Sequence, residues 1–357
     1  MRIFQLLPVI AFGDAVGNDT RALKKALLKA GYETEIYADV VDGRLPRGTA
    51  RPYGRMPRPE RGDVILYHLS TGHSMNYGVT RYPCRKIIMY HNVTPANYFD
   101  GYNRDAYENC RQGIRAAKGM RDAAEFCFAD SEYNRQELIR YGYRCPIQVL
   151  PILIPFEDYA KEPSNKVIRT FSDGKTNILF TGRIVPNKKQ EDLILAFFYY
   201  HRYINRESRL ILAGSYVGME RYKNRLEAYA KELGIWDCVY FSGMSRFQDI
   251  LAYYRVADVF LSMSEHEGFC VPLVEAMYFG IPIIARDTSA IGGTLGGSGI
   301  LLSDNDPMAA AEMIDRVITD RKLKEAVIRN QRIRLKDFDN KKVERQFLHT
   351  MEQFVGR

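Results

Sequence analysis

Residues 264–280 read SEHEGFCVPLVEAMYFG and follow an apolar run, so they are expected to form a turn between a strand and a helix. Pro272 suits a first helical turn, and Gly280 suits a helix end. Glu267 lies at the mouth of the turn, and Glu275 lies about one turn into the helix. The N–H groups of a first helical turn favour an anion. The stretch therefore predicts an anion-binding turn flanked by two carboxylates.

The composition describes a folded protein of more than one domain. The chain has 357 residues, of which 46% are hydrophobic and 26% charged. Six scattered cysteines without a C-x-x-C pair favour reduced thiols in the cytoplasm over a zinc or disulfide framework. No apolar stretch approaches the roughly 20 residues of a membrane span. The start, Met1 to Phe4, is expected to be a strand rather than a signal peptide.

The net charge of +8 has three interpretations. The first is an ordinary solvated surface, and the second is attraction to acidic substrates or to an anionic membrane. Nucleic-acid binding is not expected, because no long basic run with interleaved aromatic residues is present. One basic helix with an apolar side either meets the inner face of a membrane peripherally or packs on its sheet with a solvated outer face. Its residues are Arg21, Leu23, Lys24, Lys25, Leu27, Leu28 and Lys29.

Short apolar runs alternate with amphipathic helical patterns twice along the chain, which predicts two doubly wound α/β domains with parallel sheets. We expect an N-terminal domain at 1–155, a proline-marked linker at 156–176, a second domain at 177–335 and a last helix at 336–357. This last helix could pack back on the first domain. The expected strands are Ile3–Ile10, Thr34–Ala38, Val64–Leu69, Lys86–His91, Glu125–Ala129, Ile147–Leu150, Asn177–Thr181, Arg209–Ala213, Val239–Ser242, Val259–Met263, Pro282–Ala285 and Gly299–Leu302.

A second candidate site follows the first strand of the second domain. Arg183 and Lys188 lie five residues apart on the loop that begins with Gly182. Arginine can hold a diphosphate with two hydrogen bonds, and lysine adds a point charge. The alternative is a solvated basic loop, but its position in the same domain as the acidic turn favours a diphosphate site.

Two further candidates lie in the first domain. The loop Gly13–Gly17, between the first strand and the first helix, could let the backbone approach a phosphate or sugar. The alternative is an ordinary turn with Asn18 or Asp19 as the helix cap. His91 ends the fourth strand and could orient a sugar, although a lone histidine is more often structural.

No metal or other cofactor is expected. The D-x-D motifs at 304–306 and 337–339 lie in a polar turn and between tail helices, where they are expected to cap helices or face solvent. No spaced set of histidines and cysteines supports a structural metal.

The turn at 264–280 closely resembles the E-x7-E turn of retaining glycosyltransferases of the GT-B fold, family 4 type. Further segments of the second half match that family in order, and in the first half Ala129–Asn134 and His91 match less specifically. The resemblance implies a GT-B α/β architecture, in which two Rossmann-like domains face a cleft. It also implies a nucleotide-sugar donor. The matching segments of the second half are Gly182-Arg183 with Lys188, Leu212–Gly214, Phe241–Gly243, Ala257–Val259 and Gly280–Pro282.

The resemblance also implies roles for individual residues. Glu275 would bind the ribose, and Arg183 and Lys188 would neutralise the diphosphate. Glu267 and the backbone around it would hold the sugar hydroxyls, and His91 would close over the sugar. The remaining implied donor contacts are Gly13, Gly17, Gly182, Gly243, Met244, Gly268, Phe269, Cys270 and Val271.

Two departures from the family pattern stand out. Family members often carry Pro-Glu where this chain has Gly292-Gly293, so a carboxylate is missing from that loop. Cys270 stands where a glycine is common.

The function expected from these observations is a metal-independent retaining hexosyltransferase. It would use a UDP-sugar in preference to a GDP-sugar and act on a glycan, a polysaccharide precursor or a lipid-linked acceptor. A GT-B nucleotide-sugar epimerase is the alternative enzyme, and a binder of anionic polymers is the alternative without catalysis.

Overall fold

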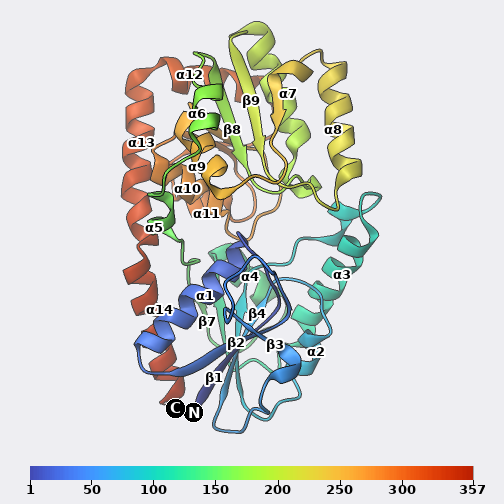
Figure 1. Ribbon diagram of the computed structural model, residues 1–357, viewed down its shortest axis with the longest axis vertical. Coiled ribbons are helices and arrows are strands. Elements are labelled where there is room, and N and C mark those ends of the chain that lie inside the picture. The colour runs from blue at the N-terminus through green and yellow to red at the C-terminus, as the bar shows by residue number, and fades with distance from the viewer. Residues whose placement is uncertain (357) are drawn as a thin grey trace. The chain divides into compact units, whose positions relative to one another are not determined.

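The computed structural model describes residues 1–356 and divides into two compact units, each built on one parallel sheet (Figure 1). Unit 1 comprises Met1–Asn97, Asp105–Pro155 and the chain from Phe338 onward. Unit 2 comprises Tyr98–Arg104 and Phe156–Asp337. The two parallel α/β domains predicted from the alternating pattern are confirmed.

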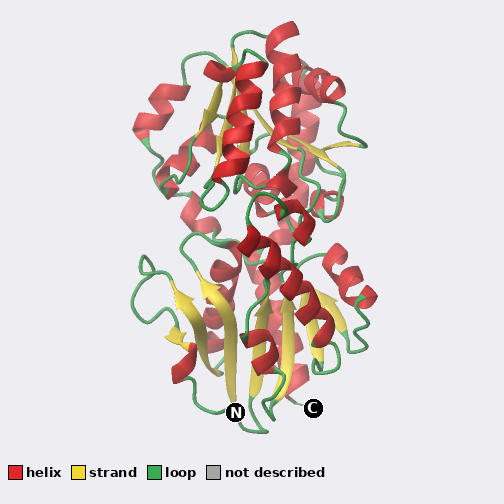
Figure 2. Ribbon diagram, turned by 90° about the vertical axis from the view of Figure 1, so that its right-hand side faces the viewer, coloured by secondary structure: helices red, strands yellow, loops and turns green. Residues whose placement is uncertain are grey.

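Unit 1 has a seven-stranded sheet in the order β3-β2-β1-β4-β5-β6-β7, drawn in yellow in Figure 2. The short elements β3 and α2 were not predicted, because two and five residues are too few to show a period. The strands are β1 (Arg2–Ile10), β2 (Glu33–Val41), β3 (Arg51–Pro52), β4 (Val64–Leu69), β5 (Arg85–Tyr90), β6 (Phe126–Ala129) and β7 (Ile147–Val149). The helices are α1 (Ala15–Lys29), α2 (Met75–Val79), α3 (Arg104–Gly119), α4 (Glu132–Arg140) and α14 (Asn340–Val355).

Both faces of the unit 1 sheet are buried, as expected for parallel strands. In β4, Ile65 and Tyr67 belong to one apolar cluster, and Val64 and Leu66 belong to the cluster on the other face. The last helix, α14, contributes to the second cluster through residues spaced along one side. These residues are Val343, Phe347, Met351 and Phe354. The last helix of the chain therefore packs within unit 1.

Helix α1 begins at Ala15, five residues before Thr20, where the amphipathic pattern predicts this helix to begin. Asp14 is its N-cap and accepts a hydrogen bond from the Gly17 N–H at 2.9 Å. Neither Asn18 nor Asp19 is the cap, and Gly17 lies in the first turn of the helix instead of in a loop. A Cβ at Gly17 would lie 3.2 Å from a side-chain carbon of Ile10, so glycine allows α1 to approach β1 closely.

The apolar side of α1 is used by the core. Leu23 and Leu27 are fully buried in the cluster shared with α14, and Lys24 pairs with Glu35 of β2. Leu28 is exposed. The arrangement matches a helix packed on its sheet with a basic outer face.

Unit 2 has a six-stranded sheet in the order β10-β9-β8-β11-β12-β13. The first strand, β8, lies between β9 and β11, so the loops that leave β8 and β11 meet at the switch point where α/β sheets bind ligands. The strands are β8 (Thr176–Thr181), β9 (Ser208–Ala213), β10 (Val239–Phe241), β11 (Val259–Ser262), β12 (Ile283–Arg286) and β13 (Ile300–Leu302). The helices are α5 (Phe156–Tyr159), α6 (Asn165–Phe171), α7 (Gln190–Tyr203), α8 (Glu220–Glu232), α9 (Phe247–Val256), α10 (Val271–Phe279), α11 (Ile291–Leu295), α12 (Pro307–Thr319) and α13 (Arg321–Leu335).

The stretch 156–176, expected as a linker, is structured and belongs to unit 2. It carries the short helices α5 and α6, and it buries Tyr159 and Phe171. One proline, Pro163, and several polar residues mark its turns, but its aromatic side chains give it apolar surface to bury against the unit.

Candidate functional site

The turn that follows β11 leads into α10 as expected. Cys270 is the N-cap of α10 with a positive φ of 71°, and no side chain caps the first turn. A left-handed backbone costs free energy in residues that carry a Cβ, so glycine would suit this position better than cysteine does. Gly280 ends the helix, also in a left-handed conformation. The turn therefore presents an uncapped helix N-terminus, which favours an anion.

Neighbouring loops hold this turn in place. The Asn187 side chain donates a hydrogen bond to the His266 carbonyl at 2.9 Å, and the Glu267 N–H donates to Ser289 Oγ at 2.8 Å. Asn187 is 3% exposed, so it fixes the turn from within the unit. Both hydrogen bonds hold the one peptide group that joins His266 to Glu267.

The Gly292-Gly293 loop, which departs from the family pattern, forms helix α11. A Cβ at Gly292 would lie 2.3 Å from Asp287 Oδ1, whereas a Cβ at Gly293 would meet nothing within 4 Å. Thr294 Oγ1 donates to the Phe269 carbonyl at 2.5 Å. The loop thus supports the turn through the Thr294 hydroxyl.

Glu267 and Lys188 form an ion pair in unit 2. Lys188 Nζ contacts Glu267 Oε2, and the Glu267 side chain is only 8% exposed. Lys188 ends a short 3-10 turn after β8, so the β8 loop and the β11 turn meet through this pair. A largely buried carboxylate needs such a partner, because an unpaired buried charge is costly.

Arg183 lies on the same β8 loop and is exposed. Among residues 1–356, its guanidinium has no ion-pair partner, and its carbonyl accepts a hydrogen bond from Gln190 Nε2 at 3.1 Å. The loop backbone is tightly placed, since a Cβ at Gly214 would lie 1.8 Å from the Gly182 carbonyl oxygen. Gly182 itself has a φ of +141°. Two glycines therefore set where Arg183 leaves the sheet.

Glu275 lies on α10, and a tyrosine hydroxyl donates to each of its carboxylate oxygens. Tyr159 donates to Oε1 at 2.8 Å, and Tyr254 donates to Oε2 at 2.5 Å. Burial raises the pKa of the Glu275 carboxyl, and the two hydrogen bonds partly offset this rise. Glu275 is therefore an oriented carboxylate held by side chains from α5 and α9.

Gly243 and Met244 follow β10. Gly243 has a φ of +64°, and the Met244 side chain is 66% exposed. A surface hollow of about 450 Å³ lies beside Met244 and is lined also by Ser242 and Arg246. This loop leaves an apolar side chain and a concave surface beside the edge strand.

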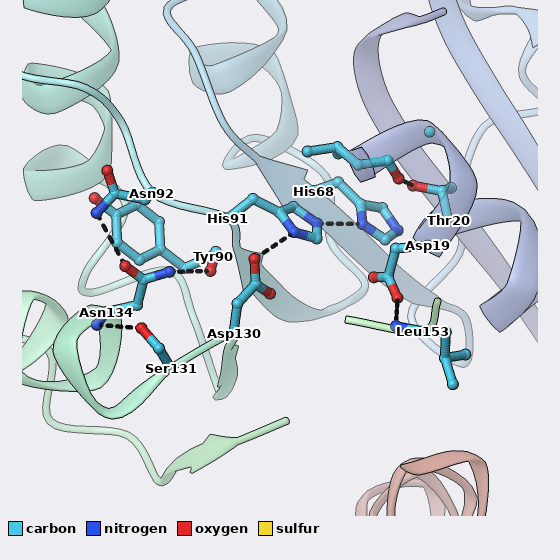
Figure 3. Close-up of polar contacts among 12 residues, drawn as sticks. Asp19, Thr20, His68, Tyr90, His91, Asn92, Asp130, Ser131, Asn134 and Leu153 are labelled. Atoms are coloured by element: carbon cyan, nitrogen blue, oxygen red, sulfur yellow. Dashed lines mark hydrogen bonds and ion pairs between the residues drawn. The ribbon is translucent and has the colours of Figure 1, made fainter. Parts of the chain in front are cut away.

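His91 lies in unit 1 within a buried polar chain (Figure 3). Its Nδ1 lies 2.9 Å from Asp130 Oδ2, and its Nε2 lies 2.9 Å from His68 Nδ1. Its side chain is only 1% exposed. Burial acts to lower the pKa of His91, but Asp130 and Asp19 more than offset this and raise it. Both ring nitrogens are thus hydrogen-bonded inside unit 1. His91 therefore has no exposed nitrogen with which to make the expected contact with a sugar.

The hydrogen-bond chain has a consistent direction when the Gln5 amide is oriented to satisfy its neighbours. In that orientation Gln5 donates to His68 Nε2, which lies 3.2 Å away. His68 then donates from Nδ1 to His91, and His91 donates from Nδ1 to Asp130. In this arrangement each imidazole has one nitrogen that donates and one that accepts, so every ring nitrogen is satisfied.

Asp19 lies beside this chain on α1 and is 3% exposed. One of its oxygens accepts a hydrogen bond from the Leu153 N–H at 2.8 Å. Burial raises the pKa of Asp19 to about 7. Asp19, His68 and His91 are the one group of possible metal ligands in residues 1–356 whose donor atoms lie within 4.8 Å of one another. A metal there would have to displace hydrogen bonds of both imidazoles.

The structure brings the unit 2 candidates together on adjoining loops at the carboxyl edge of one sheet. Arg183 and Lys188 follow β8, Glu267 follows β11, and Glu275 lies on the helix after it. In unit 1, Gly13 and His91 each follow a strand of the other sheet, and Gly17 lies within α1.

Sequence reasoning missed four polar residues that hold the candidates: His68, Asp130, Tyr159 and Tyr254. A signal existed for two of them, because His68 and Asp130 lie at the carboxyl ends of strands that neighbour the strand before His91. The two tyrosines gave no such signal, since tyrosines are frequent in this chain.

Unit 2 resembles known proteins in sequence. Residues 162–334, which lie in unit 2, match the family of glycosyl transferases group 1. The D-inositol 3-phosphate glycosyltransferase of Corynebacterium jeikeium is 27% identical over 220 residues, which are 58% of this chain and 52% of that protein. The chain thus spans about half the length of this curated relative.

Two solved structures resemble the whole chain in fold. Sucrose-phosphate synthase from Thermosynechococcus elongatus has a TM-score of 0.78 at 17% identity and covers 99% of both chains. Anabaena Alr3699/HepE in complex with UDP-glucose has a TM-score of 0.75 at 18% identity, with coverage of 99% of this chain and 100% of that one. The fold is therefore the GT-B fold.

None of the helices in residues 1–356 combines the length and the apolarity needed to cross a membrane.

Proposed function

We propose that this protein is a retaining glycosyltransferase that moves a hexose from a nucleoside diphosphate sugar to a hydroxyl group. The observation that carries the proposal is the arrangement in unit 2. Arg183 is exposed on the loop after β8, and the Lys188–Glu267 ion pair joins that loop to the turn before α10. The N-terminus of α10 has no side-chain cap, and Glu275 lies one turn into this helix. The match of residues 162–334 to glycosyl transferases group 1 supports the same conclusion.

Each part of the donor has a partner of matching chemistry. Arg183 would hold the diphosphate with paired hydrogen bonds, and the α10 amides would add to it. Lys188 would share its charge between the diphosphate and Glu267, which leaves Glu267 to accept hydrogen bonds from sugar hydroxyls. Glu275 would accept from the ribose, and Met244 would lie beside the base.

The proposed reaction keeps the configuration at the anomeric carbon. The acceptor oxygen bonds to that carbon on the face from which the diphosphate departs, as the bond from carbon to the phosphate oxygen breaks. The acceptor proton passes to an oxygen of the leaving diphosphate. Arg183 and Lys188 stabilise the negative charge that develops there, so the proposal needs no metal ion for this step.

The donor and the acceptor are proposed as classes. The resemblance in fold to a protein solved with UDP-glucose supports a UDP-sugar in preference to a GDP-sugar. The acceptor would be a glycan, a polysaccharide precursor or a lipid-linked glycan. With a lipid-linked acceptor, Arg21, Lys25 and Lys29 on the outer face of α1 would meet an anionic membrane at the cytoplasmic surface, by charge alone because Leu23 and Leu27 are buried.

The test is to screen UDP-sugars and GDP-sugars for thermal stabilisation and then to follow transfer by NMR in buffer with EDTA. With the donor that binds, Arg183→Ala is expected to lower turnover at least about a hundredfold, the loss typical of one group that stabilises developing charge. Arg329→Ala, which removes an exposed arginine of α13, is the matched control and should keep normal turnover.

Three outcomes would contradict the proposal. Normal turnover in Arg183→Ala would remove the diphosphate assignment. Conversion of the donor to its epimer without any acceptor would indicate the epimerase. Salt-sensitive binding of anionic polymers together with no affinity for nucleotide sugars would indicate a binder without catalysis.

A further inference from the structure

The Glu275 carboxylate is half-buried, and each of its two oxygens is already engaged by one hydroxyl. Tyr159 donates to one oxygen at 2.8 Å and Tyr254 to the other at 2.5 Å. A carboxylate offers about four lone-pair positions in total. Each oxygen therefore keeps one position for another donor, and the two remaining positions lie on the same carboxylate.

The direction of these hydrogen bonds follows from counting protons. Tyr254 also lies 2.5 Å from Thr181 Oγ1, and a tyrosine hydroxyl has one proton to donate. Because Tyr254 gives that proton to Glu275, Thr181 must donate to Tyr254. Thr181 ends β8, so the chain of hydroxyls connects Glu275 to the strand that carries the Arg183 loop.

Aromatic packing holds both tyrosines in place. The Tyr254 ring stacks on Phe279 at a centroid distance of 5.0 Å and an interplanar angle of 9°. The Tyr159 ring packs edge-on against Tyr278 at 5.3 Å and also contacts Phe247. Tyr159 and Tyr254 are 3% and 2% exposed, so their hydroxyls have fixed positions before any ligand arrives.

We propose that Tyr159 and Tyr254 are positioning residues that orient Glu275 to accept two hydroxyls of a vicinal cis-diol, which makes the site selective for ribonucleoside diphosphates over 2′-deoxyribonucleoside diphosphates. The inference rests on the proposed function, since it takes the ribose of the donor as the diol. A ribose can give one hydroxyl to each oxygen of the carboxylate. A 2′-deoxyribose leaves one oxygen of a half-buried carboxylate with an unmade hydrogen bond, which lowers affinity.

The experiment measures calorimetric affinities for UDP and 2′-deoxy-UDP, with GDP and 2′-deoxy-GDP as a second pair. The intact protein is expected to bind the ribonucleotide of the preferred pair at least about tenfold more tightly than its deoxy form. Tyr254→Phe and Tyr159→Phe keep the ring packing and remove one hydroxyl each. In both variants the ratio of ribonucleotide to deoxynucleotide affinity should fall to about threefold, because Glu275 loses one of the hydrogen bonds that orient it.

Two controls separate positioning from a general structural effect. Tyr278→Phe removes a hydroxyl from the same aromatic group, and that hydroxyl makes no hydrogen bond within residues 1–356, so the ratio should be unchanged. In Glu275→Ala the ratio should already be lost, and adding Tyr254→Phe should change it no further.

The outcomes distinguish this inference from the proposed function. If the intact protein prefers the ribonucleotide and both tyrosine variants keep the full ratio, the positioning role is wrong and the proposed function stands. If the intact protein binds UDP or GDP but binds the corresponding 2′-deoxy nucleotide equally tightly, the inference is overturned and the proposed function stands. If the intact protein binds neither UDP nor GDP, the proposed function and the inference both fail.

Discussion

Replacing Asp19 by asparagine should remove a loss of folding stability that unit 1 undergoes as the pH rises. Asp19 is almost fully buried, and burial raises its carboxyl pKa to about 7, whereas an aspartate in an unfolded chain has a pKa of about 4. Between these two values the folded protein binds the proton more tightly than the unfolded chain does. The stability contributed by protonated Asp19 is therefore complete below about pH 4 and is lost as the pH rises to about 7.

The size of the effect follows from the pKa difference. Each pH unit in this window changes the free energy of unfolding by about 1.4 kcal/mol, so the step from pH 5 to pH 8 costs about 3 kcal/mol as an upper limit. Asparagine has no proton to lose, and its side-chain oxygen can still accept the hydrogen bond from the Leu153 N–H. The free energy of unfolding of Asp19→Asn, relative to that of the unchanged protein, should therefore rise by up to about 3 kcal/mol between pH 5 and pH 8.

The assay is urea unfolding at pH 5 and pH 8, with hydrogen exchange of peptides from β1 and β4 as the probe of unit 1. Trp236, the single tryptophan, lies in unit 2 and reports that unit by fluorescence. His91 and Asp130 interact electrostatically with Asp19, so the difference between the two proteins measures the titration of Asp19 together with its effect on these neighbours. A pH dependence of unit 1 that is the same in both proteins would refute the reasoning.

Two further predictions concern unit 2. Gly214→Ala should abolish most donor affinity in calorimetry, because its Cβ would lie 1.8 Å from the Gly182 carbonyl oxygen and would displace the loop that carries Arg183. Gly293→Ala is the control and should bind donor normally, since its Cβ would meet nothing within 4 Å. Equal donor affinities in the two variants would contradict this prediction. Glu275→Ala should weaken binding of UDP or GDP by about tenfold or more, since it removes the ribose acceptor, and unchanged affinity would exclude that role.

The unit 2 candidates could be predicted from sequence because each lies in a short segment with its own signature. The turn before α10 combines a strand end, a proline in the first helical turn and a glycine stop, which are local features. Arg183 and Lys188 needed only their place after a strand. Parallel sheets bring such strand ends to one edge, so the grouping followed from the order of strands and helices.

The surroundings of those residues could not be predicted in the same way. The residues that orient Glu275 and Asp19 come from distant parts of the chain: Tyr159 is 116 positions from Glu275, and Leu153 is 134 positions from Asp19. No period or spacing connects such pairs. The same limit applied to the helix start at Ala15, which was set by an Asp14 side chain among several possible caps.

The sequence by itself determined two parallel α/β domains and the turn from Ser264 to Gly280, because periodicity, capping and strand ends are local properties. Only the tertiary structure decided which polar groups are used internally. The sequence predicts a sugar contact for His91, yet β4 and β6 place His68 and Asp130 on its two nitrogens. Glu275 receives two tyrosine hydroxyls from α5 and α9. Burial and hydrogen-bond partners depend on which strands and helices become neighbours, and folding alone fixes that.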